Sequence, residues 1–215
     1  MNISGSRTDR MGIQGKAAVY ADTVTKALHP KWYVLRTMPG YEQEAAELME
    51  RKISRKLWEQ CRILKKQQLF RTQGRYLLSR KDLFPGYIFV STGTPEELFE
   101  ELARAKRFPQ LMGNYGTDII PADSDKRRTD IVPVEPEDLH FLENVCGKEL
   151  EHDMCLSTVR VDEEGQVRSA VGALEPYVGR ITRQRLRHRY VTAEVPLFSR
   201  RAEVLFGIRM DGDPV

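Results

Sequence analysis

The sequence of 215 residues has only three cysteines and four histidines, and it has no long hydrophobic run. A membrane-spanning helix needs about 20 consecutive apolar residues, so we expect no membrane-embedded segment. Three cysteines are too few for a disulfide scaffold, which is typical of a reducing compartment. Residues 1–30 also lack the apolar segment of a secretory signal. We therefore expect a cytoplasmic protein.

The patterns of the common enzyme classes are missing as well. The sequence contains no Gly-rich phosphate loop, nucleophile elbow or HExxH helix. The nearest approach to a metal-binding set is His140, Cys146, His152 and Cys155. Zinc sites usually offer more closely spaced ligand pairs. We therefore predict that the protein is not an enzyme and that it has no catalytic residue, bound metal or cofactor.

Two short aromatic and β-branched segments predict neighbouring strands. One is Lys31–Thr37 and the other is Tyr87–Val90. Each adjoins a Pro-Gly turn, at Pro39-Gly40 and Pro85-Gly86 respectively. We expect the second segment to be a buried, central strand with the first beside it. Phe84 precedes its turn, where the ring either closes the core or stays available to a partner, and composition alone favours the core.

Helical patterns follow both predicted strands. The first is Tyr41–Leu57, in which apolar residues recur at every fourth position. Thr94 begins the second helix through a capping box with Glu97. A third helix covers Glu135–Val145 and ends at Gly147. Strands and helices in this order predict an α+β sandwich.

A basic hairpin is predicted between the first two helices. Its strands are Arg62–Phe70 and Arg75–Leu78, and Gln73-Gly74 forms the turn. Its basic residues are Lys65, Lys66, Arg71, Arg75, Arg80 and Lys81. Such residues usually form a solvated face. The alternative is a groove that follows a nucleic-acid backbone.

The composition changes near residue 156. From Leu156 to the end the chain has no lysine, whereas arginine is frequent. Short alternating segments predict four or five strands of a small barrel. These segments are Val167–Val171, Tyr177–Thr182, Tyr190–Val195 and Ala202–Ile208. They indicate a second domain, with Gly172 and Gly179 supplying tight bends.

Three motifs, in this order and spacing, resemble the NusG family of transcription elongation factors. They are W-Y-V-L-R-T-x-P-G-Y-E from Trp32, L-F-P-G-Y-I-F-V from Leu83 and G-A-L-E-P-Y-V-G from Gly172. The resemblance spans most of Lys31–Met210. It implies an α+β fold in which an N-terminal NGN-like antiparallel sheet flanked by helices is followed by a small C-terminal KOW β-barrel.

The resemblance and the composition together predict the domain boundaries. We expect a flexible extension at residues 1–30, an NGN-like RNA polymerase-binding domain at 31–147, a linker at 148–156 and a KOW-like domain at 157–210. An insertion is expected at about 117–132. Because the linker is polar, we expect flexible tethering with at most a small polar interface between the domains.

The resemblance implies that the first domain binds the clamp helices of the largest subunit of RNA polymerase. That contact would keep polymerase processive through pauses and terminators. The residues that match the family's apolar docking surface are Trp32, Tyr33, Tyr41, Phe84, Pro85 and Tyr87. Non-template DNA is a further candidate partner, and the chain is expected to be a monomer.

Arginines in the second domain favour RNA as another partner. Arg183, Arg185, Arg187 and Arg189 recur at every second position, which places them on one face of an extended hairpin. A solvated edge that resists aggregation is the alternative, but a guanidinium binds phosphate bidentately and reads guanine edges. The predicted RNA-binding residues are Arg180, Arg183, Arg185, Arg187, His188, Arg189, Arg200 and Arg201.

The arginine cluster makes the chain similar to the antiterminator paralogues called LoaP, whose second domain engages a nascent RNA hairpin. The sequence therefore predicts a transcription elongation and antitermination factor. Two alternatives remain: a general NusG-type factor that couples transcription to translation or termination, and a KOW-containing ribosome-associated RNA-binding protein. Pro176 and Leu197-Phe198-Ser199 depart from the usual KOW pattern, which weakens the transfer of the family's ribosome contact.

Overall fold

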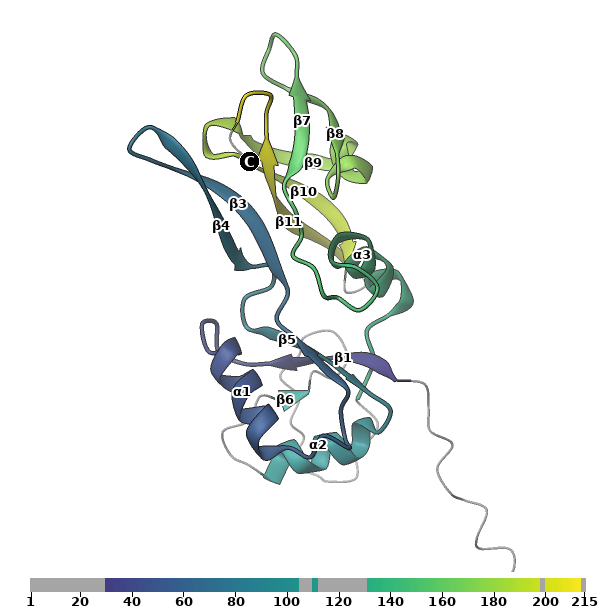
Figure 1. The fold of residues 1–215 in the computed structure, drawn as a ribbon. Coiled ribbons are helices and arrows are strands. Elements are labelled where there is room, and N and C mark those ends of the chain that lie inside the picture. Colours follow the sequence, from purple (N-terminus) through teal and green to yellow (C-terminus); the bar gives the residue numbers. More distant parts are fainter. Residues whose placement is uncertain (1–29, 105–109, 112–130, 198–199, 214–215) are drawn as a thin grey trace, which may run out of the picture.

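The computed structural model describes residues 30–104, 110–111, 131–197 and 200–213 (Figure 1). Nearly all of the predicted N-terminal extension and of the predicted insertion lies outside these residues. The elements fall into a first sheet with its helices, a projecting hairpin and a second sheet at the C-terminal end. This arrangement confirms the α+β class. No helix among the described residues is long and apolar enough to cross a membrane.

The first sheet is built around the strand that follows the Pro85-Gly86 turn. Its strands are β1 (Lys31–Arg36), β2 (Gln60–Arg62), β5 (Tyr87–Thr92) and β6 (Gln110–Leu111), in the order β2-β5-β1-β6. β5 lies antiparallel to β1, with Tyr33 opposite Val90 and Leu35 opposite Ile88. The predicted central strand and its neighbour are therefore confirmed. Because successive side chains on a strand point to opposite faces, β1 supplies two different cores.

Helices α1 (Glu42–Lys52) and α2 (Pro95–Arg104) cover one face of this sheet (Figure 1). We call the buried cluster between them the helix-side core. Its buried residues are Tyr33, Leu35, Ala45, Met49, Ile53, Trp58, Ile88, Val90, Leu98 and Leu102. α1 ends before the predicted Leu57, because Ile53 already has an extended backbone.

The start of α2 differs from the predicted capping box. The helix begins at Pro95, which suits the first helical turn. The Thr94 amide, however, donates to Thr92 Oγ1 at 2.9 Å. The Thr94 hydroxyl is buried and has no hydrogen-bond partner among the described residues. Thr92, two positions earlier, therefore satisfies the amide that the capping box would have assigned to Glu97.

The basic hairpin is shifted along the chain relative to the prediction, with a longer second strand, and it leaves the first sheet. Its strands are β3 (Lys65–Thr72) and β4 (Arg75–Asp82), which form a separate two-stranded sheet. The turn residues Gln73 and Gly74 both have positive φ, at 47° and 78°, as a tight two-residue hairpin turn requires. Figure 1 shows the hairpin running alongside the second sheet.

The second domain is a curled five-stranded sheet with the order β8-β7-β11-β10-β9 (Figure 1). Its strands are β7 (Ser157–Val161), β8 (Val167–Val171), β9 (Ile181–Arg185), β10 (Tyr190–Leu197) and β11 (Arg200–Arg209). The predicted strand Tyr177–Thr182 is wrong for most of its length. The short 3-10 helix η3 (Glu175–Arg180) occupies it. Gly172 has the positive φ, 107°, expected of a tight bend.

The segment predicted as a polar linker is packed against the hairpin. Leu150 and Met154 are only 2% and 1% exposed. The Met154 amide donates to the Lys65 carbonyl, and the Gln67 amide donates to the Met154 carbonyl, both at 2.8 Å. The backbone at Met154 therefore pairs with β3. The side chains of Leu150 and Met154 are buried as a result. The expected flexible linker is wrong for these residues.

Helix α3 (Pro136–Cys146) joins the two halves of the molecule. The Phe141 ring meets Tyr177 edge-on with centroids 5.9 Å apart, and Tyr177 stacks on Phe206 at 5.8 Å. One apolar cluster, here called the interdomain core, runs from the first sheet through α3 into the second sheet. It includes Trp32, Val34, Phe89, Phe141, Leu142, Leu150, Met154, Val191, Phe206 and Ile208. The predicted small polar interface is therefore wrong.

Strand β11 and the hairpin also approach each other closely. A Cβ atom added to Gly207 would lie 2.1 Å from the Gln67 carbonyl oxygen. Only a residue without a side chain can occupy this crossing. Gly207 thus allows β3 of the first domain to lie directly against β11 of the second.

Candidate functional site

The two Pro-Gly turns of the first domain are held together by one buried carboxylate. Glu42, at the start of α1, is 3% exposed. Its Oε2 accepts the Gly40 N–H at 2.8 Å and its Oε1 accepts the Gly86 N–H at 2.5 Å. The Thr37 amide in turn donates to the Gly86 carbonyl at 2.8 Å. The two turns therefore form one rigid edge beside β1 and β5.

The charge on Glu42 is maintained by these hydrogen bonds. Burial by itself raises the pKa of a carboxyl group. The amides of Gly86, Glu42 and Gly40 outweigh that effect, so the pKa of Glu42 lies below its ordinary value. Gly86 has φ of 86°, and a Cβ there would lie 3.0 Å from the Thr37 carbonyl oxygen. A glycine is therefore needed where the turns touch.

The exposed part of this edge contains some of the predicted polymerase-binding residues. Tyr41 is 53% exposed, and Pro85 is also exposed. Phe84 and Tyr87 are half-buried, and the Phe84 ring lies 6.1 Å from the Phe89 ring between centroids. Sequence reasoning missed Met38, which is 70% exposed. Its position directly before Pro39, in a turn, was the available signal.

Trp32 and Tyr33 do not belong to that exposed edge. They are adjacent on β1, and therefore face opposite sides of the sheet. Trp32 lies in the interdomain core and Tyr33 in the helix-side core, and both are buried. Their assignment to a docking surface is corrected to a structural role. We name the remaining surface, Met38, Tyr41, Phe84, Pro85 and Tyr87, the turn surface.

The predicted arginine face is only partly extended. β9 ends at Arg185, and the 3-10 turn η4 (Leu186–His188) follows. Arg183, Arg185, Arg187 and His188 are exposed. The period-two prediction therefore fails after Arg185, because residues in a 3-10 turn no longer alternate between two faces. Of the other predicted residues, Arg180 and Arg201 are exposed, whereas the side chain of Arg200 lies outside the description.

Arg189 has a structural role instead of a place on the exposed face. It has a left-handed backbone with φ of 53°. Its guanidinium donates to both carboxylate oxygens of Asp213 at 2.5 and 2.6 Å, and to the Leu186 carbonyl at 2.6 Å. It also lies 4.4 Å from the centroid of the Tyr76 ring. These contacts hold the η4 turn, the chain end and the hairpin together.

The histidines and cysteines weighed as a metal set are not brought together. Among the described residues no group of three or more potential ligands is placed to hold a metal ion. Cys146 is buried, and burial raises the pKa of its thiol to about 12. His152 Nε2 lies 3.2 Å from Glu151 Oε1 at the surface. His140 lines a different feature.

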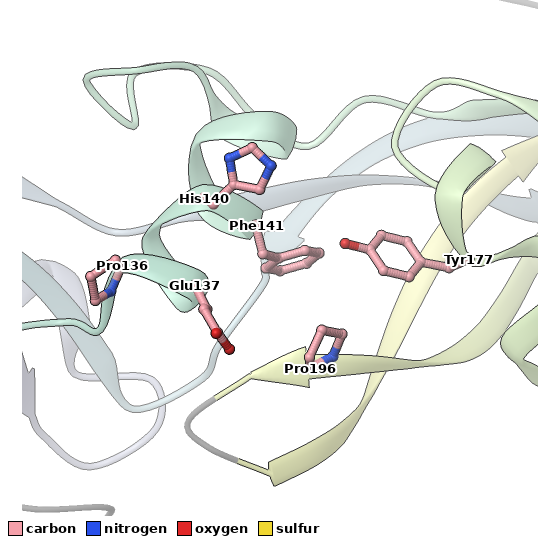
Figure 2. Close-up of a pocket in the computed structure, with 6 residues that line it drawn as sticks. All are labelled: Pro136, Glu137, His140, Phe141, Tyr177 and Pro196. Carbon is pink, nitrogen blue, oxygen red and sulfur yellow. The ribbon is translucent and has the colours of Figure 1, made fainter.

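That feature is a pocket of about 400 Å³ between α3 and the second domain (Figure 2). Figure 2 shows the hydroxyl end of Tyr177 pointing toward the Phe141 ring. Its lining residues are Pro136, Glu137, His140, Phe141, Tyr177 and Pro196. The pocket marks the crevice where α3 meets the second domain, so its shape depends on how the domains dock.

Comparisons with known proteins point to one family. Residues 30–130 match the family model described as transcription termination factor nusG. Over these residues, the chain is similar to the NusG family. The match contains both Pro-Gly turns, Glu42 and the hairpin. The rigid edge formed by the two turns therefore lies inside the NusG-like region.

Two relatives extend the likeness along the chain. The transcription termination/antitermination protein NusG of Thermus thermophilus is 25% identical over 181 residues, covering 81% of this chain and 93% of that protein. A solved structure titled "Domain interaction in Thermotoga maritima NusG" is 23% identical, with a TM-score of 0.45. It covers 83% of this chain and 93% of that one. The similarity to the Thermus thermophilus protein therefore extends beyond the residues that the family model matches.

Proposed function

We propose that this chain is a member of the NusG family and a specialised antitermination factor of the LoaP type. Its first domain binds the clamp helices of RNA polymerase, and its second domain binds a nascent RNA hairpin. The observation that carries the proposal is the set of exposed arginines at β9 and η4. Among the described residues, no carboxylate forms an ion pair with Arg183, Arg185 or Arg187. An RNA backbone supplies the missing negative charge.

The turn surface supports the polymerase contact. Met38, Tyr41 and Pro85 expose apolar groups beside turns that Glu42 holds rigid. A pre-organised apolar anchor loses little conformational entropy on binding, which favours affinity. The family resemblance also implies non-template DNA as a partner. This DNA would lie close to the protein once the protein is bound to polymerase.

The RNA half of the proposal is tested by transcription in vitro. The template carries a leader that encodes an RNA hairpin, followed by an intrinsic terminator. The wild-type chain should increase readthrough, and Arg183→Ala, Arg185→Ala and Arg187→Ala combined should abolish the increase while polymerase still co-purifies with the variant. Full readthrough by the triple variant would contradict RNA binding by these arginines and would favour a solvated edge that only resists aggregation.

The polymerase half is tested by binding to purified RNA polymerase. Tyr41→Ala should weaken affinity by about 2 kcal/mol or more, as truncation of a central aromatic anchor does. Phe70→Ala is the matched control, because Phe70 is an aromatic of similar exposure on the hairpin. Equal affinities for wild type and the Tyr41 variant would contradict docking through the turn surface.

A general NusG-type factor is the second candidate, because the Thermus thermophilus relative is named a termination/antitermination protein. It predicts readthrough or termination effects that do not depend on the leader hairpin. A ribosome-associated RNA-binding protein is the third. Co-purification of polymerase with the tagged chain after RNase treatment would exclude that third reading.

A further inference from the structure

The tip of the first-domain hairpin touches the arginine turn of the second domain. Tyr76, on β4, donates its hydroxyl hydrogen to the Arg187 carbonyl at 3.2 Å. The Arg189 guanidinium lies over the same ring at 4.4 Å from its centroid. A cation over an aromatic face is an attractive contact. Both contacts join residues more than a hundred positions apart, and they fix the hairpin tip beside η4.

This contact gathers positive charge from both domains. Arg71 lies opposite Tyr76 on the paired strand, 5.9 Å from the centroid of the Tyr76 ring. The Arg71 side chain is exposed, as are Arg185 and Arg187 on the other side of the contact. Cations on both sides of one contact repel one another unless an anion lies nearby.

Carboxylates do not neutralise this group. Asp213 pairs with Arg189, whose side chain is 12% exposed and lies over the Tyr76 ring. Among the described residues, no carboxylate pairs with Arg71, Arg185 or Arg187. The hairpin's other pairs are Lys65 with Asp82 and Arg80 with Asp153, at the far end from the tip. The tip therefore carries uncompensated charge in a fixed arrangement.

We propose that Arg71 of the first-domain hairpin forms one RNA-binding surface with Arg185 and Arg187 of the second domain. This inference rests on the proposed function and enlarges its RNA site. The composite surface exists only while the domains are docked. RNA bound across it therefore stabilises the docked arrangement by the same factor by which docking strengthens RNA binding.

The chemistry of the three arginines favours a nucleic-acid backbone. Guanidinium groups bind phosphate oxygens bidentately, with a geometry that lysine does not match. A folded RNA presents phosphates along two strands at once, which suits cations on two neighbouring protein elements. The Tyr76 ring is already covered by Arg189, so it positions the tip and does not stack on a base.

The test uses the full chain and a labelled RNA stem-loop, titrated at two salt concentrations. Two variants are compared: Arg71→Gln, and Arg185→Gln with Arg187→Gln. The first should weaken binding about threefold or more and reduce the salt slope by about one, and the second should weaken it about tenfold or more and reduce the slope by about two, one for each lost phosphate contact. Arg51→Gln is the charge-matched control for Arg71→Gln, because Arg51 is exposed at the end of α1.

The outcomes separate this inference from the proposed function. If only the second-domain variant weakens binding, the composite surface is overturned and the proposed function stands. If neither variant weakens it, both are overturned. If the control variant weakens binding as much as the hairpin variant, the effect is bulk charge and the composite surface is overturned.

Competitors test the chemical class of the partner. Poly-glutamate and duplex DNA of the same sequence should compete at least tenfold less well than unlabelled stem-loop. Equal competition by poly-glutamate would overturn the RNA assignment in favour of an acidic protein segment. Equal competition by duplex DNA would likewise overturn it.

A variant of Tyr76 tests the dependence on docking. Tyr76→Ala removes no charge, but it removes the contacts that hold the tip against η4. RNA affinity should fall at least threefold, while far-UV circular dichroism and polymerase binding stay as in wild type. Unchanged RNA affinity would overturn the claim that the docked tip is required. The Phe70→Ala variant, on the outer face of the same hairpin, should bind RNA as wild type does.

Discussion

The two faces of the first sheet are covered in different ways. The helix-side core is closed by α1 and α2, which directly follow β1 and β5 in the chain. The interdomain core is closed by α3 and by strands of the second sheet, which lie far along the chain. Local segments therefore complete one face, whereas the other needs the second domain. The difference shows that the domains of this chain share one apolar interior.

The largest effect is expected from Phe206→Ala in the interdomain core. Phe206 is almost fully buried and stacks on Tyr177. Its loss should cost about 3 to 5 kcal/mol of unfolding free energy. Hydrogen exchange should rise in α3 and in the second sheet together. Met49→Ala, in the helix-side core, should cost a similar amount but leave exchange in the second sheet unchanged.

Different changes in hydrogen exchange in α3 and in the second sheet would show that the two do not share one core. If Phe206→Ala destabilises the second sheet but leaves α3 and β3 protected, the interdomain core is not one cooperative unit. Calorimetry of the wild type provides an independent measurement, because a shared core predicts a single unfolding transition.

Gly207→Ala should have the next largest effect. The added Cβ would lie 2.1 Å from the Gln67 carbonyl oxygen, so β3 and β11 must separate. Overpacking of this kind costs about 1 to 3 kcal/mol, and the Gln67 amide should lose protection from exchange. Gly179→Ala is the control, because a Cβ there meets no atom within 4 Å. A Gly207 variant as stable as the control would contradict the close crossing.

Glu42→Gln tests how much the buried carboxylate contributes to the stability of the first domain. The variant keeps one side-chain carbonyl for two turn amides, so it should lose about 1 to 3 kcal/mol at neutral pH. The pKa of Glu42 is lowered in the folded state, so its contribution is present above the unfolded pKa. That contribution is lost as pH falls through the folded pKa.

The wild type should therefore lose more stability on acidification than the Glu42→Gln variant does. Denaturant titrations at neutral and acid pH measure the difference. Glu44→Gln is the control, because Glu44 is exposed in the same helical turn. Parallel pH profiles for wild type and the Glu42 variant would rule out a carboxylate clasp.

The smallest effect is expected at the start of α2. Thr94→Ala should change stability by less than about 0.5 kcal/mol, because the Thr94 hydroxyl has no partner among the described residues. A true capping residue would cost about 0.5 to 2 kcal/mol. Thr92→Ala should cost more, since Thr92 Oγ1 donates to Leu57 and accepts from Thr94. A larger loss of unfolding free energy in the Thr94 variant would support the capping box after all.

The candidate sites were only partly predictable. Tyr41 and Pro85 were found by their motifs, and Arg183, Arg185 and Arg187 by composition. The role of Glu42 was not predictable, because its second partner, Gly86, lies 44 positions away. Trp32 and Tyr33 were misassigned, since a strand with a core on each face buries its central side chains. Arg71 resembled an ordinary solvated charge until the hairpin was placed beside η4.

Local patterns in the sequence alone determined the two central strands of the first sheet, β1 and β5, together with the three helices and the tight turn of the hairpin. Turn chemistry and side-chain periodicity act over a few residues, so they can be recognised in the sequence without knowledge of the tertiary structure. Tertiary structure decided the docking of the domains, the burial of Leu150 and Met154 in a polar segment, and the internal role of Arg189. Those outcomes depend on pairing between β3, β11 and the segment near Met154. Contacts between distant segments have no periodic signal in the sequence, because the chain that separates them does not constrain which surfaces meet.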